Sequence, residues 1–148
     1  MQRFRFRLDR VLDWRRKEYR VEETRLAACV ALVHAIEKKI ERLRAERASI
    51  ESDLLGRDAI PAADFANLGR YRLRADKERI ELSEQRRQGL LSAAGQRARV
   101  QQAEQRVKLL EKMRERRLEE HTAAVNHELE NLAAEAYLAR WPRLRRAE

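Results

Sequence analysis

The stretch that decides the fold runs from Leu26 to Leu54 and reads LAACVALVHAIEKKIERLRAERASIESDL. Its apolar residues recur at alternating intervals of three and four. We call this line of positions the seam, and eight of its nine members are apolar: Leu26, Cys29, Val33, Ile36, Ile40, Leu43, Arg47, Ile50 and Leu54. An average spacing of 3.5 residues keeps the seam facing one partner helix, which predicts a coiled coil. Some other helix must therefore cover it.

The composition of the 148-residue chain excludes most other folds. Charged residues make up 40% and aromatic residues only 5%, and there are four glycines and two prolines. A sheet protein needs frequent turns, and the turn residues here are too few for one. A chain dominated by Ala, Glu, Lys, Leu and Arg is typical of long helices. We therefore expect an all-α protein with a thin core.

The seam extends backwards from Leu26. Leu8, Leu12 and Tyr19 fall on the same register, while Arg15 and Glu22 make it less apolar there. These positions predict a first helix over about 8–55. In residues 1–7, Phe4 and Phe6 alternate with arginines, and we expect a helical first turn or a frayed arm there in preference to a strand.

A turn is predicted at residues 56–61, which read GRDAIP. Glycine just past the last seam residue and proline a few residues later are typical of a helix end followed by a new start. A short connection between two long helices makes them antiparallel neighbours. The second helix should therefore cover the seam of the first.

The second helix is predicted over about 62–141, with a break near Gly69 as one alternative and a basic tail at 142–148. Proline disfavours α conformation in the residue before it, so Trp141–Pro142 should end the helix. After Leu110 the register slips, and a slip of four residues locally unwinds a coiled coil. The expected seam of this helix comprises Phe65, Leu68, Ala75, Leu82, Leu90, Ala93, Val100, Ala103, Val107 and Leu110.

The two helices differ in length, which predicts an uncovered segment. About 48 residues face about 80, and closing the hairpin at residues 56–61 puts Leu8 opposite a residue near 110–119. We call the part of the second helix beyond that point the overhang. An apolar surface without a cover commonly binds a partner. The candidates on the overhang are Leu118, Val125, Leu129, Leu132, Tyr137 and Trp141. The whole chain is expected to form a single coiled-coil domain.

The net charge of +9 is concentrated at the ends. Residues 1–20 carry +5 and residues 138–148 carry +3, while 56–137 sum to +2. Basic ends can neutralise phosphates, but no stacking platform or basic zipper region is present, so we do not expect nucleic-acid binding. Acidic residues interrupt any basic face in residues 1–20, which limits membrane contact to a peripheral one. Without an apolar run or a leader, the chain is expected in the cytoplasm.

No catalytic or metal-binding arrangement is evident. His34, His121 and His127 lack the i, i+4 spacing of a helical ligand pair. Cys29, the single cysteine, permits no internal disulfide and lies on the seam as a small core residue. We predict a protein that is not an enzyme and needs no cofactor.

The first residues of the chain resemble the start of the flagellar export protein FliJ family. The resemblance rests on FRLDRVLDWR at residues 6–15, on Glu18, and on Leu26–Ala27. LLEKMRERR at residues 109–117 is similar to a further segment of that family. The plan of one helix, a tip near residue 60 and a longer second helix also matches. The C-terminus departs from the pattern, because Trp141–Pro142 and arginines stand where a more acidic ending is expected.

This resemblance implies a component of type III flagellar export with a hairpin like the central stalk of rotary ATPases. It implies binding to the hexameric export ATPase, to the cytoplasmic domain of the export gate and to unloaded export chaperones, as an adaptor and escort. The injectisome counterpart has the same shape.

The hairpin expected from the residue pattern and the partners implied by the resemblance together give candidate binding sites. An antiparallel hairpin brings the basic N-terminus to the apolar overhang. We hypothesise that this end enters the ATPase ring through Arg3, Arg5, Arg7 and Arg10 together with the overhang residues. Phe65, Leu68 and Tyr71, just after the turn, are the candidates for the export gate, unless they only cap the seam. The alternatives are a coiled-coil scaffold of unrelated machinery, as a homodimer through the overhang, or a basic nucleic-acid-binding helical protein.

Overall fold

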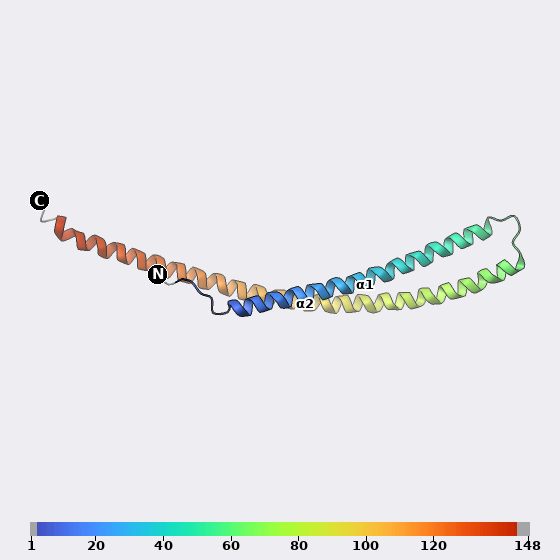
Figure 1. Ribbon diagram of the computed structural model, residues 1–148, viewed down its shortest axis with the longest axis horizontal. Helices are drawn as coiled ribbons and strands as arrows, with labels where there is room; N and C mark the ends of the chain where they lie inside the picture. Colours follow the sequence, from blue (N-terminus) through green and yellow to red (C-terminus); the bar gives the residue numbers. More distant parts are fainter. Residues whose placement is uncertain (1–2, 145–148) are drawn as a thin grey trace. The chain divides into compact units, whose positions relative to one another are not determined.

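The computed structural model describes residues 3–144, with side chains placed for residues 3–138. Helix α1 spans Asp9–Leu55 and helix α2 spans Ala62–Leu144, and no strand occurs in the described part of the chain. Figure 1 shows the two helices joined by one turn as an antiparallel hairpin, with α2 the longer. The predicted fold class is confirmed.

Contacts within the chain divide the hairpin into two units. Unit 1 combines the described residues of Met1–Glu18 and Ala103–Glu148, and unit 2 is Tyr19–Gln102. Each unit therefore contains a segment of α1 and an antiparallel segment of α2.

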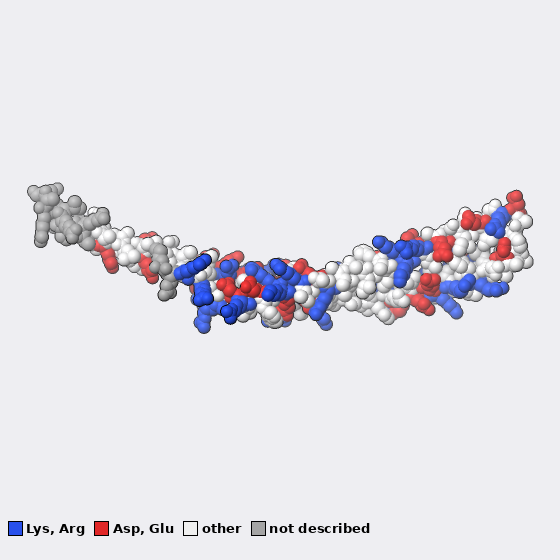
Figure 2. Space-filling view, viewed as in Figure 1, with Lys and Arg blue, Asp and Glu red and all other residues white. Residues whose placement is uncertain are grey.

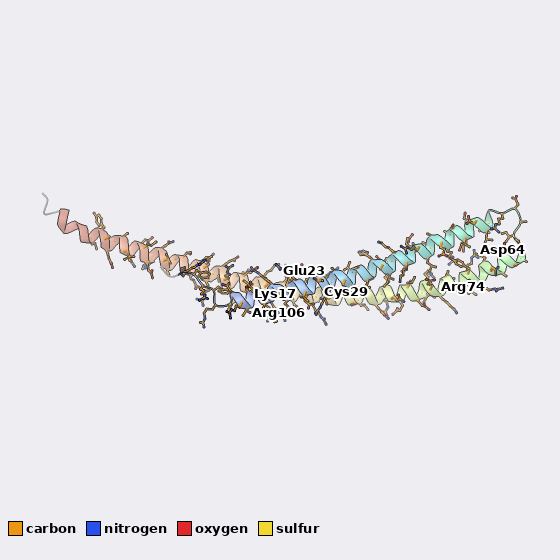
Figure 3. The ribbon with its side chains drawn as sticks, in the orientation of Figure 1. Lys17, Glu23, Cys29, Asp64, Arg74 and Arg106 are labelled. Atoms are coloured by element: carbon orange, nitrogen blue, oxygen red, sulfur yellow. The ribbon has the colours of Figure 1, made fainter. Side chains whose placement is uncertain are left out.

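In unit 2, the seam of α1 faces α2 as predicted. Val33 is buried, and the other eight seam residues from Leu26 to Leu54 are all half-buried. The exposed residues between them are mainly charged or alanine. Cys29 lies where α1 runs beside α2 (Figure 3), and its Sγ is 3.9 Å from Ser92 Oγ. The period of 3.5 residues therefore decides which face is covered.

The predicted seam of α2 is right at most positions and wrong at two. Leu68, Ala75, Leu82 and Ala93 are buried in unit 2, but Phe65 and Leu90 are exposed. The half-buried residue in place of Leu90 is its neighbour, Gly89. A Cβ added to Gly89 would lie 3.0 Å from Val33 Cγ2. Glycine is poorer than alanine in a helix by about 1 kcal/mol, and here it permits close packing against Val33.

A polar pair is buried in the same seam. Gln96 is 8% exposed, and its Nε2 donates hydrogen bonds to the backbone oxygen of Glu22, at 3.2 Å, and to Glu22 Oε2. Glu22 is one of the polar seam positions noted in the sequence. A buried polar group that would lose its partner in any other alignment helps to specify the register of a coiled coil.

The turn and the helix ends differ in detail from expectation. α1 ends at Leu55, but no described glycine has a positive φ, so Gly56 does not form a left-handed cap. α2 begins after Pro61 and continues through Gly69 without a break. It also continues past Pro142 to Leu144, so Trp141 does not end it. Proline removes one N–H donor, and the helix accommodates this loss in its last turn.

In unit 1, the N-terminal residues are neither a helical turn nor a frayed arm. Residues 3–6 have no regular structure, yet Phe6 is buried and the Phe4 ring packs edge-on to His121, with centroids 5.5 Å apart. We call residues 3–8 the arm. Its two phenylalanines gain enough apolar contact with α2 to hold an irregular backbone in place.

Cross-helix ion pairs define the register of unit 1. Arg16 Nη2 lies 2.7 Å from Glu111 Oε1, and Arg114 Nε lies 3.5 Å from Asp9 Oδ1. Between them lies Leu12, which is 1% exposed. The start of α1 is therefore opposite residues 111–114, within the range of 110–119 expected from helix lengths.

Candidate interaction surfaces

The arm presents a basic surface in unit 1. Arg3, Arg5, Arg7 and Arg10 are all exposed, and none of them forms an ion pair within the described residues. Phe6 is buried and Phe4 half-buried, whereas the arginines beside them, Arg3, Arg5 and Arg7, are exposed. The arm and α2 together line an open groove whose α2 side is formed by Met113, Arg117, Glu120 and His121.

The overhang of α2, from residue 118 on, lies in unit 1, and the arm contacts it at His121. In the described side chains, α1 and the arm leave most of it in solvent: Leu118, Leu129, Leu132, Tyr137 and Leu138 are exposed, and Val125 is half-buried. Trp141 lies outside the residues whose side chains are described. The apolar positions 118, 125, 129, 132 and 136 follow a spacing of about 3.5 residues, so they share one face of the helix.

The charge of the overhang is opposite to that of the arm. Residues 118–138 contain five glutamates and no lysine or arginine, the glutamates being Glu119, Glu120, Glu128, Glu130 and Glu135. Figure 2 shows red and white atoms along this part of α2. The sum of charge over 56–137 conceals these glutamates, because basic residues outside the overhang cancel them. Counting charge over the overhang alone would have found it.

The three candidates next to the turn have different surroundings. Phe65 is exposed, whereas Leu68 is buried in the seam of unit 2. Tyr71 is half-buried, and its hydroxyl is buried without a hydrogen-bond partner among the described residues. Burial raises the pKa of Tyr71, and the nearby carboxylates of Glu46 and Glu78 raise it further. Only Phe65 of the three offers most of its side chain to a partner.

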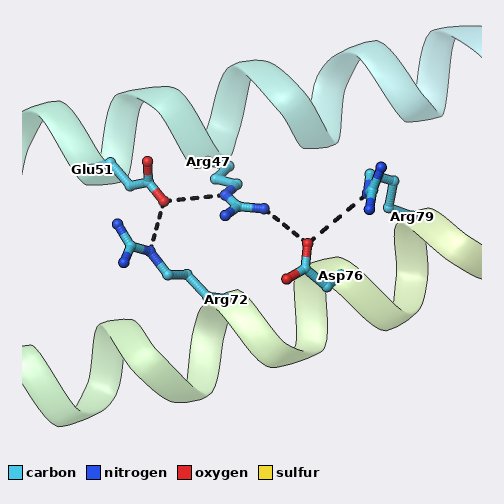
Figure 4. A network of polar contacts seen from close by, with 5 residues as sticks. All are labelled: Arg47, Glu51, Arg72, Asp76 and Arg79. Carbon is cyan, nitrogen blue, oxygen red and sulfur yellow. Dashed lines mark hydrogen bonds and ion pairs between the residues drawn. The ribbon is translucent and has the colours of Figure 1, made fainter.

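An ion-pair network crosses between α1 and α2 in unit 2 (Figure 4). Arg47, on the seam, donates from Nε to Glu51 Oε1 at 3.1 Å and from Nη1 to Asp76 Oδ1 at 2.9 Å. Arg72 Nε also donates to Glu51 Oε1, at 2.8 Å, and Arg79 Nε lies 3.9 Å from Asp76 Oδ1. Hydrogen bonds from Arg47 and Arg72 lower the pKa of the Glu51 carboxyl below its ordinary value of 4.5.

We predict that Arg47→Leu stabilises unit 2, raising Tm by a few degrees at pH 7. Leucine restores an apolar seam between Leu43 and Ile50, and ion pairs between side chains that stay partly open to solvent contribute little. The change strands no carboxylate, because Glu51 keeps Arg72 and Asp76 keeps Arg79. Thermal unfolding followed by circular dichroism measures the effect. Arg44→Leu, at an exposed position off the seam, is the control and should change Tm little.

The same variant has a predictable pH dependence. A carboxyl whose pKa is lowered by folding stabilises the fold above its unfolded pKa, and this contribution disappears as pH falls through the folded value. The wild type should therefore lose more stability than Arg47→Leu between pH 7 and pH values below 4.5. A lower Tm for Arg47→Leu at pH 7 would show that the network outweighs the apolar gain.

Neither a metal-binding group nor a membrane-spanning helix is found among the described residues. No group of three or more His, Cys, Asp or Glu side chains in residues 3–138 could hold a metal ion. Over the part of the chain that the structure describes, neither helix is long and apolar enough to cross a membrane.

Taken together, the fold and its exposed surfaces define a two-helix coiled-coil hairpin whose second helix is the longer. The sequence matches the family described as Flagellar FliJ protein over residues 4–132. The chain therefore belongs to the FliJ family, a non-catalytic component of flagellar protein export. No curated protein and no solved structure matches it.

Proposed function

We propose that this protein is an adaptor of flagellar type III export that works in the cytoplasm and binds the hexameric export ATPase through unit 1. The observation that carries this proposal is the overhang, whose apolar face has no cover among the described residues although it continues a coiled-coil spacing. A helix of this kind can be inserted between helices or subunits of a partner, as the stalk of a rotary ATPase is.

The arm of unit 1 is basic and the overhang is acidic, so each should contact a surface of opposite charge on the ATPase. The overhang would meet apolar side chains flanked by lysine or arginine, because its own flanks carry five glutamates. The arm would meet acidic residues. Complementary charge on both patches favours one orientation of the hairpin in the ring, since the reversed orientation brings like charges together.

We further propose that the turn end of unit 2 contacts the cytoplasmic domain of the export gate, and that export chaperones are escorted by the same protein. Phe65 is the exposed apolar candidate, and Leu68 and Tyr71 would act by holding the α2 segment beneath it. Association with the inner membrane would then be peripheral, through the export apparatus.

Replacing Arg3, Arg5, Arg7 and Arg10 together by glutamate tests the orientation. None of the four has an ion pair within the described residues, so the fold should be retained while affinity for the export ATPase falls at least tenfold, or about 1.4 kcal/mol. Isothermal titration with purified ATPase measures this. The matched control reverses Lys38, Lys39, Arg97 and Arg99, four exposed basic residues of unit 2. Equal affinity of the arm variant and the wild type would refute the proposed orientation.

A further inference from the structure

The apolar face of the overhang has one polar position, and the arm lies against it. His121 follows Leu118 by three residues and precedes Val125 by four, a spacing that keeps side chains on one face of a helix. The Phe4 ring packs edge-on to the His121 ring, with centroids 5.5 Å apart. Among the described side chains of residues 118–138, those of His121 and Val125 are half-buried and the others are exposed. Because α1 begins opposite residues 111–114, the contact at His121 is made by the arm.

The contacts that hold the arm on α2 come mainly from its two phenylalanines. Phe6 is 8% exposed and Phe4 is half-buried. No backbone hydrogen bond joins residues 3–8 to α2 in the described chain, and the three arginines of the arm form no ion pair there. An irregular segment without such bonds opens at a low free-energy cost, because release returns the conformational entropy of its backbone.

Charge opposes the position of the arm. Besides His121, the ionisable residues that line the groove between the arm and α2 are four arginines and one glutamate: Arg3, Arg5, Arg7, Arg117 and Glu120. Glu120 Oε2 is already paired with Arg117 Nη1, at 2.9 Å. Like charges gathered within about 10 Å of each other repel at ordinary salt concentration. The apolar contacts of the two phenylalanines therefore hold the arm against this repulsion.

We propose that the arm is a displaceable cover, which leaves His121 when a partner helix packs along the apolar face of the overhang. This inference rests on the proposed function and adds a regulation of the same site. The helix that fits has apolar residues at heptad spacing and lysine or arginine beside them, because residues 118–138 contain five glutamates and no lysine or arginine. Where such a helix extends from Val125 to Leu118, it needs the space of the Phe4 ring. Its apparent affinity is therefore lowered by the cost of releasing the arm.

Fluorine NMR of the full chain reports the position of the arm. The chain contains three phenylalanines, Phe4, Phe6 and Phe65, so labelling with para-fluorophenylalanine gives three resonances, which Phe4→Leu and Phe65→Leu assign. The probe is a synthetic helix with leucine at heptad positions a and d and lysine at e and g, whose like-charged flanks oppose self-association. Adding this peptide should move the Phe4 resonance toward its position in the urea-unfolded chain. The resonance of Phe65, an exposed residue of unit 2, should not move.

Removing the cover should strengthen binding of the same peptide. For Phe4→Ala we expect the Kd to fall about threefold or more, because the peptide no longer has to displace the ring. Phe65→Ala is the matched control and should leave the Kd unchanged. Leu129→Gln with Leu132→Gln should weaken binding about tenfold or more, which shows that the peptide lies on the overhang. Fluorescence anisotropy with the labelled peptide measures each Kd, and circular dichroism checks that the helices are retained.

The proposal is overturned if the peptide does not bind, if it binds while the Phe4 resonance stays in place, or if Phe4→Ala weakens its binding. The last result would make Phe4 a part of the binding surface. The export ATPase is titrated in parallel with the wild type and Phe4→Ala. If the peptide displaces the arm but the ATPase does not bind the wild type, the cover stands and the proposed function fails. If the ATPase binds the wild type and Phe4→Ala equally well and the Phe4 resonance does not move, the cover fails and the proposed function stands.

Discussion

Replacing Leu129 and Leu132 together by glutamine is expected to lower affinity for the export ATPase at least a hundredfold, or by about 2.7 kcal/mol. Apolar residues that become fully buried in an interface commonly contribute more than 1 kcal/mol each. Glutamine preserves helix propensity and charge, so α2 should remain intact. Titration calorimetry with purified ATPase measures affinity, and circular dichroism checks the fold.

Leu109→Gln is the control for the overhang variant. Leu109 is 62% exposed and Leu132 is 61% exposed, and both lie on α2 in unit 1. Leu109, however, precedes the overhang and faces away from the apolar line of residues 118–136. Leu109→Gln also removes one exposed leucine from α2, but it should leave the affinity for the export ATPase unchanged. If the control and the overhang variant bind equally well, the overhang is not the ATPase contact.

Leu12→Ala should give the largest loss of stability of any single substitution in unit 1, about 2–5 kcal/mol. Leu12 is the largest fully buried side chain in the described chain, at 1% exposure. A thin two-helix core has few neighbouring side chains that can move into the resulting cavity. Urea unfolding followed by circular dichroism measures the change, and hydrogen exchange reports whether opening is confined to unit 1.

Val11→Ala is the matched control, since Val11 is adjacent in sequence but exposed. Its effect should stay within about 0.5 kcal/mol. Because the arm packs beside the start of α1, Leu12→Ala should also release Phe4 from His121 and increase protease cleavage within the arm. A loss of less than about 1 kcal/mol would show that unit 1 is not held together by this core.

Much of the fold could be predicted from residue spacing alone. The nine seam residues from Leu26 to Leu54 all lie on the covered face, because a 3.5-residue period has only one way to face a straight partner. The turn was predicted from Gly56 and Pro61. The unequal helix lengths followed from the position of that turn in the chain. The exposed overhang followed from those lengths. Leu118, Leu129, Leu132 and Tyr137 are exposed as expected, whereas Val125 is half-buried.

Other features could not be predicted from period and composition. Gly89 and Leu90 are adjacent, and hydrophobicity favoured Leu90, but the close approach of Val33 Cγ2 leaves little room for a side chain at position 89. Gln96 was overlooked because a buried amide becomes acceptable only when Glu22 accepts its hydrogen bonds. The prediction for the arm failed because residues 3–8 show no clear preference for helix or strand. Their conformation depends on contacts with α2, such as that of Phe4 with His121.

The sequence by itself determined that this chain forms two antiparallel helices and where they reverse, because local helix preference and heptad spacing act over short distances along the chain. Only the tertiary structure decided which residue of α2 lies against each seam position, where the arm runs, and which apolar side chains remain in solvent. Those outcomes depend on the shapes and hydrogen-bonding groups of two segments that meet across long separations in sequence.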